Sequence, residues 1–174
     1  PVMNSEQTLT LGASVSTEPS EQYLTFSLRD EVFAMDIRRV REIIQYSSMT
    51  AVPHMPEFVR GVINLRGAVV PVIDLHSRFG RGRAELGKKT CIIIFDGSRE
   101  GEKLELGLMV DAVSEVIDIA QSMIESAPQF GASITRDYIH GMGKVGTKFV
   151  VILDPDRALD IEDMANLVEQ AQDA

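Results

Sequence analysis

The sequence predicts a mainly β protein, in which an internal duplication gives two small five-stranded barrels, followed by a C-terminal helix. Short runs rich in β-branched and aromatic residues recur between residues 23 and 153, as expected for strands. Polar or glycine-containing segments separate neighbouring runs, which favours hairpins. In addition, the second half of the chain repeats the apolar pattern of the first half.

Length and charge limit the functions that the chain can have. With 174 residues, it has room for one ordinary domain or two very small ones. A net charge of -9 and a pI of about 4.8 argue against a nucleic-acid partner, because such surfaces need clustered Lys and Arg. No apolar run approaches the roughly 20 residues that span a bilayer, and the N-terminus lacks a basic region followed by an apolar stretch. We therefore expect a cytoplasmic protein that does not insert into a membrane.

The predicted elements follow one another in a simple order. Residues 1–20 are mostly small and polar, which predicts a flexible tail. The clearest strand patterns then lie at residues 23–28, 32–37, 68–73, 90–95, 104–110 and 148–153. Short polar segments separate the first two runs and the fourth and fifth runs, so each of these pairs is a candidate hairpin. The glycine-rich and basic segment 80–89 connects the two halves.

The duplication is visible as two constant offsets. Residues 33–44 align with residues 106–117 at an offset of 73, with coincident apolar positions and with Glu42 opposite Glu115. Residues 58–61 align with residues 138–141 at an offset of 80, so the second copy has a connection seven residues longer. A unit of about 70 residues with five short strands can close into a barrel, which removes exposed sheet edges. We expect the first barrel at 21–82 and the second at 83–155, with strand exchange between them left open.

The end of the chain predicts a helix within residues 156–174. Asp160 is a capping residue with acidic residues in the following turn. Apolar residues then follow helical spacing, at Ile161, Met164, Leu167, Val168 and Ala171.

Motifs that carry chemistry are weak in this sequence. Residues 141–146 spell GxGxxG, but a strand follows rather than a helix, so we expect these glycines to serve turns and close backbone approach. His54, His76 and His140 lack partners at metal-ligand spacing and are expected at the surface or in hairpins. Cys91 is the only cysteine, which excludes an intramolecular disulfide. The sequence therefore predicts no catalytic residues, no metal and no cofactor.

One long segment closely resembles a family signature. Residues 57–75 read Glu-Phe-Val-Arg-Gly-Val-Ile-Asn-Leu-Arg-Gly-Ala-Val-Val-Pro-Val-Ile-Asp-Leu, and they resemble the signature of the CheW family. Residues 26–28, 40–43, 107–111, 127–130 and 138–143 resemble the family in the same order. The resemblance extends over about residues 23 to 167. It implies two intertwined five-stranded barrels related to SH3 or OB folds, without enzymatic activity.

The resemblance also implies partners and site residues. CheW-like proteins bind the regulatory domain of a CheA-type histidine kinase and the cytoplasmic tip of methyl-accepting chemoreceptors. Glu42 and Arg66 match a pair linked to signalling and kinase coupling. For Arg66, the alternative is a solvated hairpin arginine. Five apolar residues match the family's receptor groove, although each of them is also consistent with an ordinary core residue: Leu24, Ile37, Val40, Ile43 and Val113.

We therefore expect a non-enzymatic chemotaxis adaptor. The alternative is a CheW-like regulatory fragment of a larger CheA or CheV-type protein, whose ATP-binding or receiver motifs do not occur in this sequence. A barrel enzyme or a single-strand DNA-binding module is a third hypothesis. The acidic pI and the aromatic content of 6% argue against the basic channels and stacking platforms that nucleic acid requires.

Overall fold

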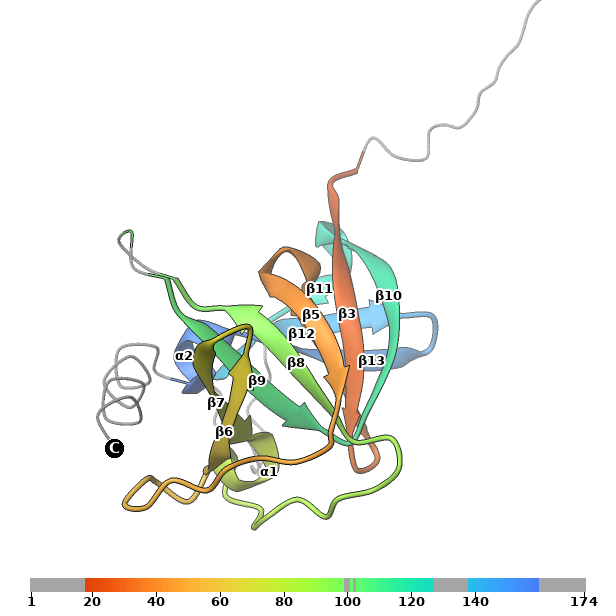
Figure 1. The fold of residues 1–174 in the computed structure, drawn as a ribbon. Helices are drawn as coiled ribbons and strands as arrows, with labels where there is room; N and C mark the ends of the chain where they lie inside the picture. Colours follow the sequence, from red (N-terminus) through yellow and green to blue (C-terminus); the bar gives the residue numbers. More distant parts are fainter. Residues whose placement is uncertain (1–17, 99–100, 102, 127–137, 160–174) are drawn as a thin grey trace, which may run out of the picture.

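The described strands form two sheets (Figure 1), and side chains from both sheets pack into one central cluster. The structure is a computed structural model that describes residues 18–98, 101, 103–126 and 138–159. One sheet has six strands in the order β10-β3-β4-β13-β12-β11, and the other has five in the order β5-β8-β9-β7-β6. The predicted mainly β class is confirmed. The helix expected from Asp160 onward and most of the N-terminal tail lie outside the described residues.

All six runs predicted from the sequence are strands, and both predicted hairpins are antiparallel pairs, β3 with β4 and β8 with β9. The six-stranded sheet contains β3 (Ser20–Leu28), β4 (Glu31–Asp36), β10 (Ala112–Ala120), β11 (Ile124–Glu125), β12 (Ile139–Val145) and β13 (Lys148–Leu153). The five-stranded sheet contains β5 (Val40–Gln45), β6 (Val59–Leu65), β7 (Ala68–Asp74), β8 (Cys91–Asp96) and β9 (Glu105–Val110). The short helical turns are η2 (Ile37–Arg39), α1 (Leu75–Arg78), η3 (Gln121–Met123) and α2 (Pro155–Leu159).

Each sheet takes strands from both copies of the repeat. Five strands of one sheet, β10-β3-β4-β13-β12, correspond one by one to β5-β8-β9-β7-β6 of the other. The pairing registers of the two parallel strand pairs agree as well. Val72 pairs with Gly107 in one sheet, and their equivalents in the repeat, Ile152 and Ala34, pair in the other sheet. In Figure 1, β3 from the first copy lies beside β10 from the second. This exchange is the intertwined arrangement that the family resemblance implies.

The core explains why β8 is apolar throughout. Successive side chains of a strand point to opposite faces. Ile92 and Ile94 pack in a cluster of the five-stranded sheet, whereas Ile93 and Phe95 pack in a central cluster built from both sheets. A third cluster around Tyr23 belongs to the six-stranded sheet. A strand that is buried on both faces needs a continuous apolar run, which is what the sequence has.

A buried ion pair holds the connection between the two copies. The carboxylate of Asp74 is fully buried and accepts hydrogen bonds from Arg60 Nη1 at 2.8 Å, from the Ala84 amide at 2.8 Å and from the Ser77 amide at 3.3 Å. The repeat-mate of Asp74, the residue at the equivalent position of the second copy, is Asp154. Among the described residues, it accepts the local backbone amides of Asp156 and Arg157 and a longer contact from the Arg157 side chain at 3.7 Å. The segment 80–89 is therefore anchored through Ala84.

Two expectations about single residues are corrected or refined. His76 was expected at the surface but is 1% exposed, and its Nε2 lies 3.1 Å from both carboxylate oxygens of Asp111. The reason is that α1 packs this face of the turn against β9. Gly141 lies within β12, where a Cβ atom would meet the Glu125 carbonyl oxygen at 2.8 Å, so it permits close backbone approach. Gly146 has a φ of 63° and serves the β12–β13 turn.

Candidate functional site

The two residues expected to form a coupling pair are in contact. Arg66 Nη2 lies 2.7 Å from Glu42 Oε1, which joins the β6–β7 turn to β5. The two side chains are 66% and 33% exposed, so the pair is available to a partner. The hydrogen bond from Arg66 to Glu42 raises the pKa of the arginine further above its usual range. The functional role of the pair stays a prediction.

The backbone at Arg66 adopts the left-handed conformation, as it does at Arg29 and His54. Arg66 has a φ of 53° and Gly67 a φ of 87°, between the paired residues Leu65 and Ala68. The left-handed region is unfavourable for residues with a Cβ atom. In the second copy the equivalent position is Gly146, which adopts this conformation without strain. An arginine thus occupies a position where glycine is the easier choice, and a functional role at this turn stays a prediction.

A strip of apolar side chains lies over the central cluster. Ile43 is 42% exposed and Val116 is 46% exposed, and they are repeat-mates at an offset of 73. Ile43 pairs with buried Ile93 on β8, and Val116 pairs with buried Leu24 on β3. Val40 and Val113 lie beside these two residues and are partly buried against the central cluster. We call these four residues, Val40, Ile43, Val113 and Val116, the junction strip.

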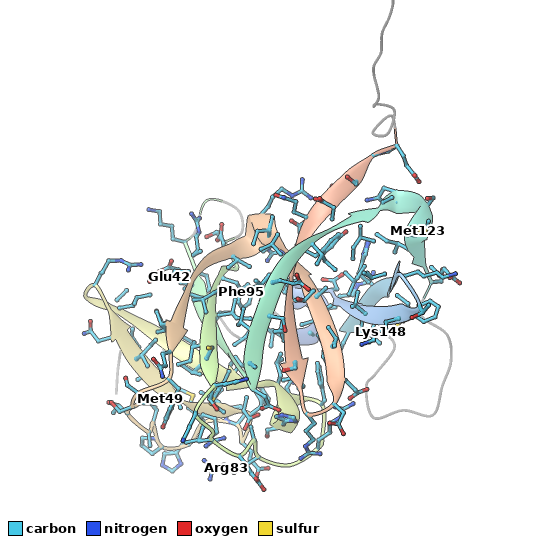
Figure 2. The ribbon with its side chains drawn as sticks, turned by 90° about the vertical axis from the view of Figure 1, so that its right-hand side faces the viewer. Glu42, Met49, Arg83, Phe95, Met123 and Lys148 are labelled. Atoms are coloured by element: carbon cyan, nitrogen blue, oxygen red, sulfur yellow. The ribbon has the colours of Figure 1, made fainter. Side chains whose placement is uncertain are left out.

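The five residues expected in the receptor groove therefore differ in exposure. Ile43 is exposed, whereas Ile37, Val40 and Val113 are partly buried against the central cluster. Leu24 is only 2% exposed and lies beneath the surface. Figure 2 shows Glu42 on β5 and Phe95 of the central cluster deeper in the molecule. The structure thus brings four of the five residues to the central cluster, whereas Ile43 lies exposed on β5.

Sequence reasoning did not select Val116 as a site residue. Its side chain is more exposed than that of Ile43, at 46% against 42%. The signal that finds it is the duplication, because adding 73 to the number of Ile43 gives 116. The alternation of apolar and polar residues along β10 is weak, which hides this position from pattern analysis.

Charged residues beside the junction strip neutralise one another. Arg38 bridges Asp36 and Glu21 at 2.6 and 2.9 Å, and Arg41 contacts Asp96 at 2.8 Å. The hydrogen bond from the Arg38 side chain is the main cause that lowers the pKa of Asp36 below its usual range. The arginines Arg38 and Arg41 beside the strip are therefore paired with carboxylates, whereas the exposed Glu115 lies within the strip on β10.

One half-open cavity of about 510 Å³ on the described part of the chain is lined by charged side chains, among them Glu21, Asp36, Arg38 and His140. Within residues 18–98, 103–126 and 138–159, no group of three His, Cys, Asp or Glu side chains is placed to hold a metal ion. A half-open cavity of about 360 Å³ lies between β5 and β6, where Ile44, Met49 and Ile63 line it together with Ser47 and Asn64. Its lining has hydroxyl and amide groups but no carboxylate, histidine or cysteine. No described helix has the length and apolar character that crossing a membrane requires.

Comparison with known proteins identifies the family. Residues 22–163 match the family described as CheW-like domain. The chain belongs to the CheW family. It is 32% identical to the chemotaxis protein CheW of Klebsiella aerogenes over 145 residues, which are 83% of this chain and 85% of the relative. It is also 32% identical to the chemotaxis protein CheW of Treponema pallidum over 149 residues, covering 84% and 88% of the two chains.

A solved CheW structure has the same fold. The scaffolding protein TtCheW from Thermoanaerobacter tengcongensis matches with a TM-score of 0.70 and 39% sequence identity, over 78% of this chain and 90% of that one. The resemblance inferred from residues 57–75 is thereby confirmed. With it, the expected role as a CheW-type chemotaxis coupling adaptor is confirmed at the level of the family.

Proposed function

We propose that this CheW-family chain is a non-enzymatic cytoplasmic adaptor that binds the tip of methyl-accepting chemoreceptors and the regulatory domain of a CheA-type histidine kinase, and that it supports activation of the kinase. One observation carries the proposal beyond the family assignment. The exposed repeat-mates Ile43 and Val116 lie over a core that both sheets share, and the exposed Glu42–Arg66 ion pair begins one residue away from Ile43.

The junction strip is the proposed receptor surface. A receptor tip is helical, and a helix binds by placing an apolar face against apolar side chains of its partner. Ile43 and Val116 supply exposed apolar area, while Val40 and Val113 lie partly exposed beside them. Ile37 and Leu24 support the surface from the central cluster. Because the strip comes from both copies of the repeat, the docked helix would contact both sheets.

The Glu42–Arg66 pair is the proposed element for kinase coupling. It connects β5, which carries part of the junction strip, with the β6–β7 turn. A partner that contacts Arg66 can therefore influence β5 through one hydrogen bond of 2.7 Å. An exposed ion pair contributes little to folding, which leaves both charges available for recognition.

The other partner classes are poorly matched to this chain. The net charge of -9 disfavours nucleic acid and anionic lipid. Adaptor function requires specific surfaces rather than a reactive centre, and the exposed features described above are surfaces of this kind. Cytoplasmic location follows from the proposed partners, since both the kinase and the receptor tip act there.

The test is reconstitution of the three components. Receptor fragments, a CheA-type kinase and this protein are mixed, and autophosphorylation of the kinase is measured with labelled ATP. We expect the protein to raise kinase activity only when the receptor fragments are present. Saturable binding of ATP to the protein alone, or unchanged kinase activity in the complete mixture, would contradict the proposal. Lys88→Gln, which alters an exposed residue of the connection, serves as the control variant.

A further inference from the structure

The second copy of the repeat has a cavity beside the position at which the first copy has a buried ion pair. In the first copy, Arg60 Nη1 lies 2.8 Å from Asp74 Oδ2, and the two side chains are 10% and 0% exposed. The equivalent residues of the second copy, at the offset of 80, are His140 and Asp154. Both of them line the half-open cavity of about 510 Å³ described above. The repeat thus relates this cavity to the place of a buried arginine side chain.

The backbone at the two places is the same, so the comparison is direct. The amides of Asp74 and Asp154 donate to the carbonyl oxygens two positions before Arg60 and His140, at 2.7 and 2.9 Å. Arg60 and His140 each lie at the irregularity in the pairing of their hairpin. The side chains of the two pairs therefore start from equivalent backbone positions.

The two aspartates differ in the use of one carboxylate oxygen. Asp74 Oδ1 accepts the amide of Ser77, and Asp154 Oδ1 accepts the amide of the equivalent residue Arg157, both at 3.3 Å. Asp74 Oδ2 accepts Arg60 Nη1 at 2.8 Å. Among the described residues, the cation nearest to Asp154 Oδ2 is the Arg157 side chain at 3.7 Å, which is too far for a hydrogen bond. The oxygen that holds an arginine in the first copy is thus available for one in the second.

His140 leaves the space that an arginine side chain fills in the first copy. Its side chain is exposed, and within the described part of the chain no ion pair joins it to Asp154. An arginine side chain is longer than an imidazole side chain, and its planar guanidinium group has five N–H donors in a fixed arrangement. The replacement of Arg60 by its shorter counterpart therefore leaves room for a guanidinium group from another source.

The charges around the cavity favour a cation. Besides Asp154, the lining includes the carboxylates of Glu21 and Asp36 and the guanidinium groups of Arg38 and Arg39. Arg38 is paired with Glu21 and Asp36, and Arg39 is paired with a carboxylate outside the lining. Among the described residues, Asp154 is therefore the lining carboxylate without an arginine at hydrogen-bond distance. The net charge of -9 also attracts a basic partner.

We propose that the cavity beside Asp154 receives an arginine side chain of a partner protein, which pairs with Asp154 as Arg60 pairs with Asp74. The first copy selects the chemistry, because it holds a guanidinium group at the equivalent place and a lysine ammonium group lacks the planar arrangement of donors. The cavity is half-open, so a side chain that projects from a partner surface has access to it. The receptor and kinase residues proposed above do not line the cavity, which makes it an additional contact.

The probe for the test is the peptide acetyl-Gly-Ala-Arg-Ala-Gly-amide, titrated into the full chain labelled with nitrogen-15 at low salt. NMR shifts should be confined to the residues that line the cavity. We expect Asp154→Asn to weaken binding about tenfold or more, since it removes one partner of a partly buried charge pair. The control Asp30→Asn makes the same charge change at the exposed β3–β4 turn and should bind as the unchanged protein does. Peptides with lysine or citrulline in place of arginine should bind about fivefold and tenfold more weakly.

The variant His140→Arg tests the same geometry without a partner. The longer side chain should fill the cavity and pair with Asp154, as the equivalent residues do in the first copy. The melting temperature should therefore rise, and the peptide should no longer bind. Adding Asp154→Asn to this variant should remove the gain in melting temperature, because the two changes act on one interaction.

Other outcomes overturn the proposal. An absence of shifts at the lining residues, or equal peptide binding by Asp154→Asn and Asp30→Asn, would exclude the cavity. Equal binding of the arginine and lysine peptides would reduce the effect to general charge attraction, and free arginine that binds more tightly than the peptide would assign the cavity to a small molecule. Tighter peptide binding by Arg136→Gln would show that an arginine of this chain fills the cavity, and an unchanged melting temperature of His140→Arg would contradict the geometry. Kinase activation in the reconstituted mixture tests the adaptor role independently.

Discussion

Replacing Ile43 by serine should weaken receptor binding by an amount that its exposure determines. Full burial of an isoleucine side chain contributes about 1.5 to 3 kcal/mol. Ile43 is 42% exposed, so about 0.6 to 1.3 kcal/mol remains for a receptor helix to gain. The expected loss of affinity for Ile43→Ser is therefore about 3- to 9-fold. Val116→Ser, at 46% exposure, should act similarly, and the double variant should lose roughly 10- to 100-fold.

The assay is titration calorimetry with a soluble helical-hairpin fragment of the receptor tip. The free energy of unfolding should fall by only about 1 to 2 kcal/mol for each variant, because part of each side chain is buried in the unbound protein. Leu86→Ser is the matched control, since Leu86 is 46% exposed but lies on the connection 80–89. Unchanged affinity in the double variant, or an equal loss in the Leu86→Ser control, would refute the placement of the receptor on the junction strip.

Three further predictions concern coupling, the buried part of the strip and stability. Arg66→Glu should abolish kinase activation in the reconstituted mixture with an unchanged melting curve, because the ion pair is exposed; parallel loss of fold and activity would favour a structural role. Val40→Lys and Val113→Lys should each lose receptor binding and stay folded, because lysine can extend its charged end to solvent; unfolding in thermal melts would show that these positions belong to the core. Asp74→Ala should lower the unfolding free energy by about 3 to 5 kcal/mol, and its repeat-mate variant Asp154→Ala by only about 1 kcal/mol. Urea denaturation measures both, and equal losses would contradict the importance of the buried ion pair.

The strands that the sequence predicts clearly are those with a buried face along their whole length. β8 is apolar at every position from Ile92 to Phe95, because each face meets a different cluster. The sequence pattern did not predict β5 and β10 as strands, because they lie at sheet edges and carry charged residues such as Arg41 and Glu115. β12 was hidden for another reason, since Gly141 and Gly143 resemble turn residues until their crowded surroundings are known.

The site was predicted in its composition but not in its exposure. Alternation along a strand tells which side chains share a face, but not which face the rest of the chain covers. Leu24 and Val116 illustrate the difference, because they are paired across two strands and yet are 2% and 46% exposed. The contact between Glu42 and Arg66 joins residues 24 positions apart, and only the family resemblance indicated it before the structure.

The exchange of strands between the sheets has a consequence for biosynthesis. β3 and β4 leave the ribosome early, but their neighbours β10 and β13 are made only after residue 111. Until those strands are synthesised, the outer edges of the N-terminal hairpin have unpaired backbone groups, which can pair with other nascent chains. A single copy of the repeat would keep these edges unpaired. It could pair them by forming a domain-swapped dimer with the topology of the present monomer. The covalent link through residues 80–89 makes that assembly intramolecular, so folding does not depend on protein concentration.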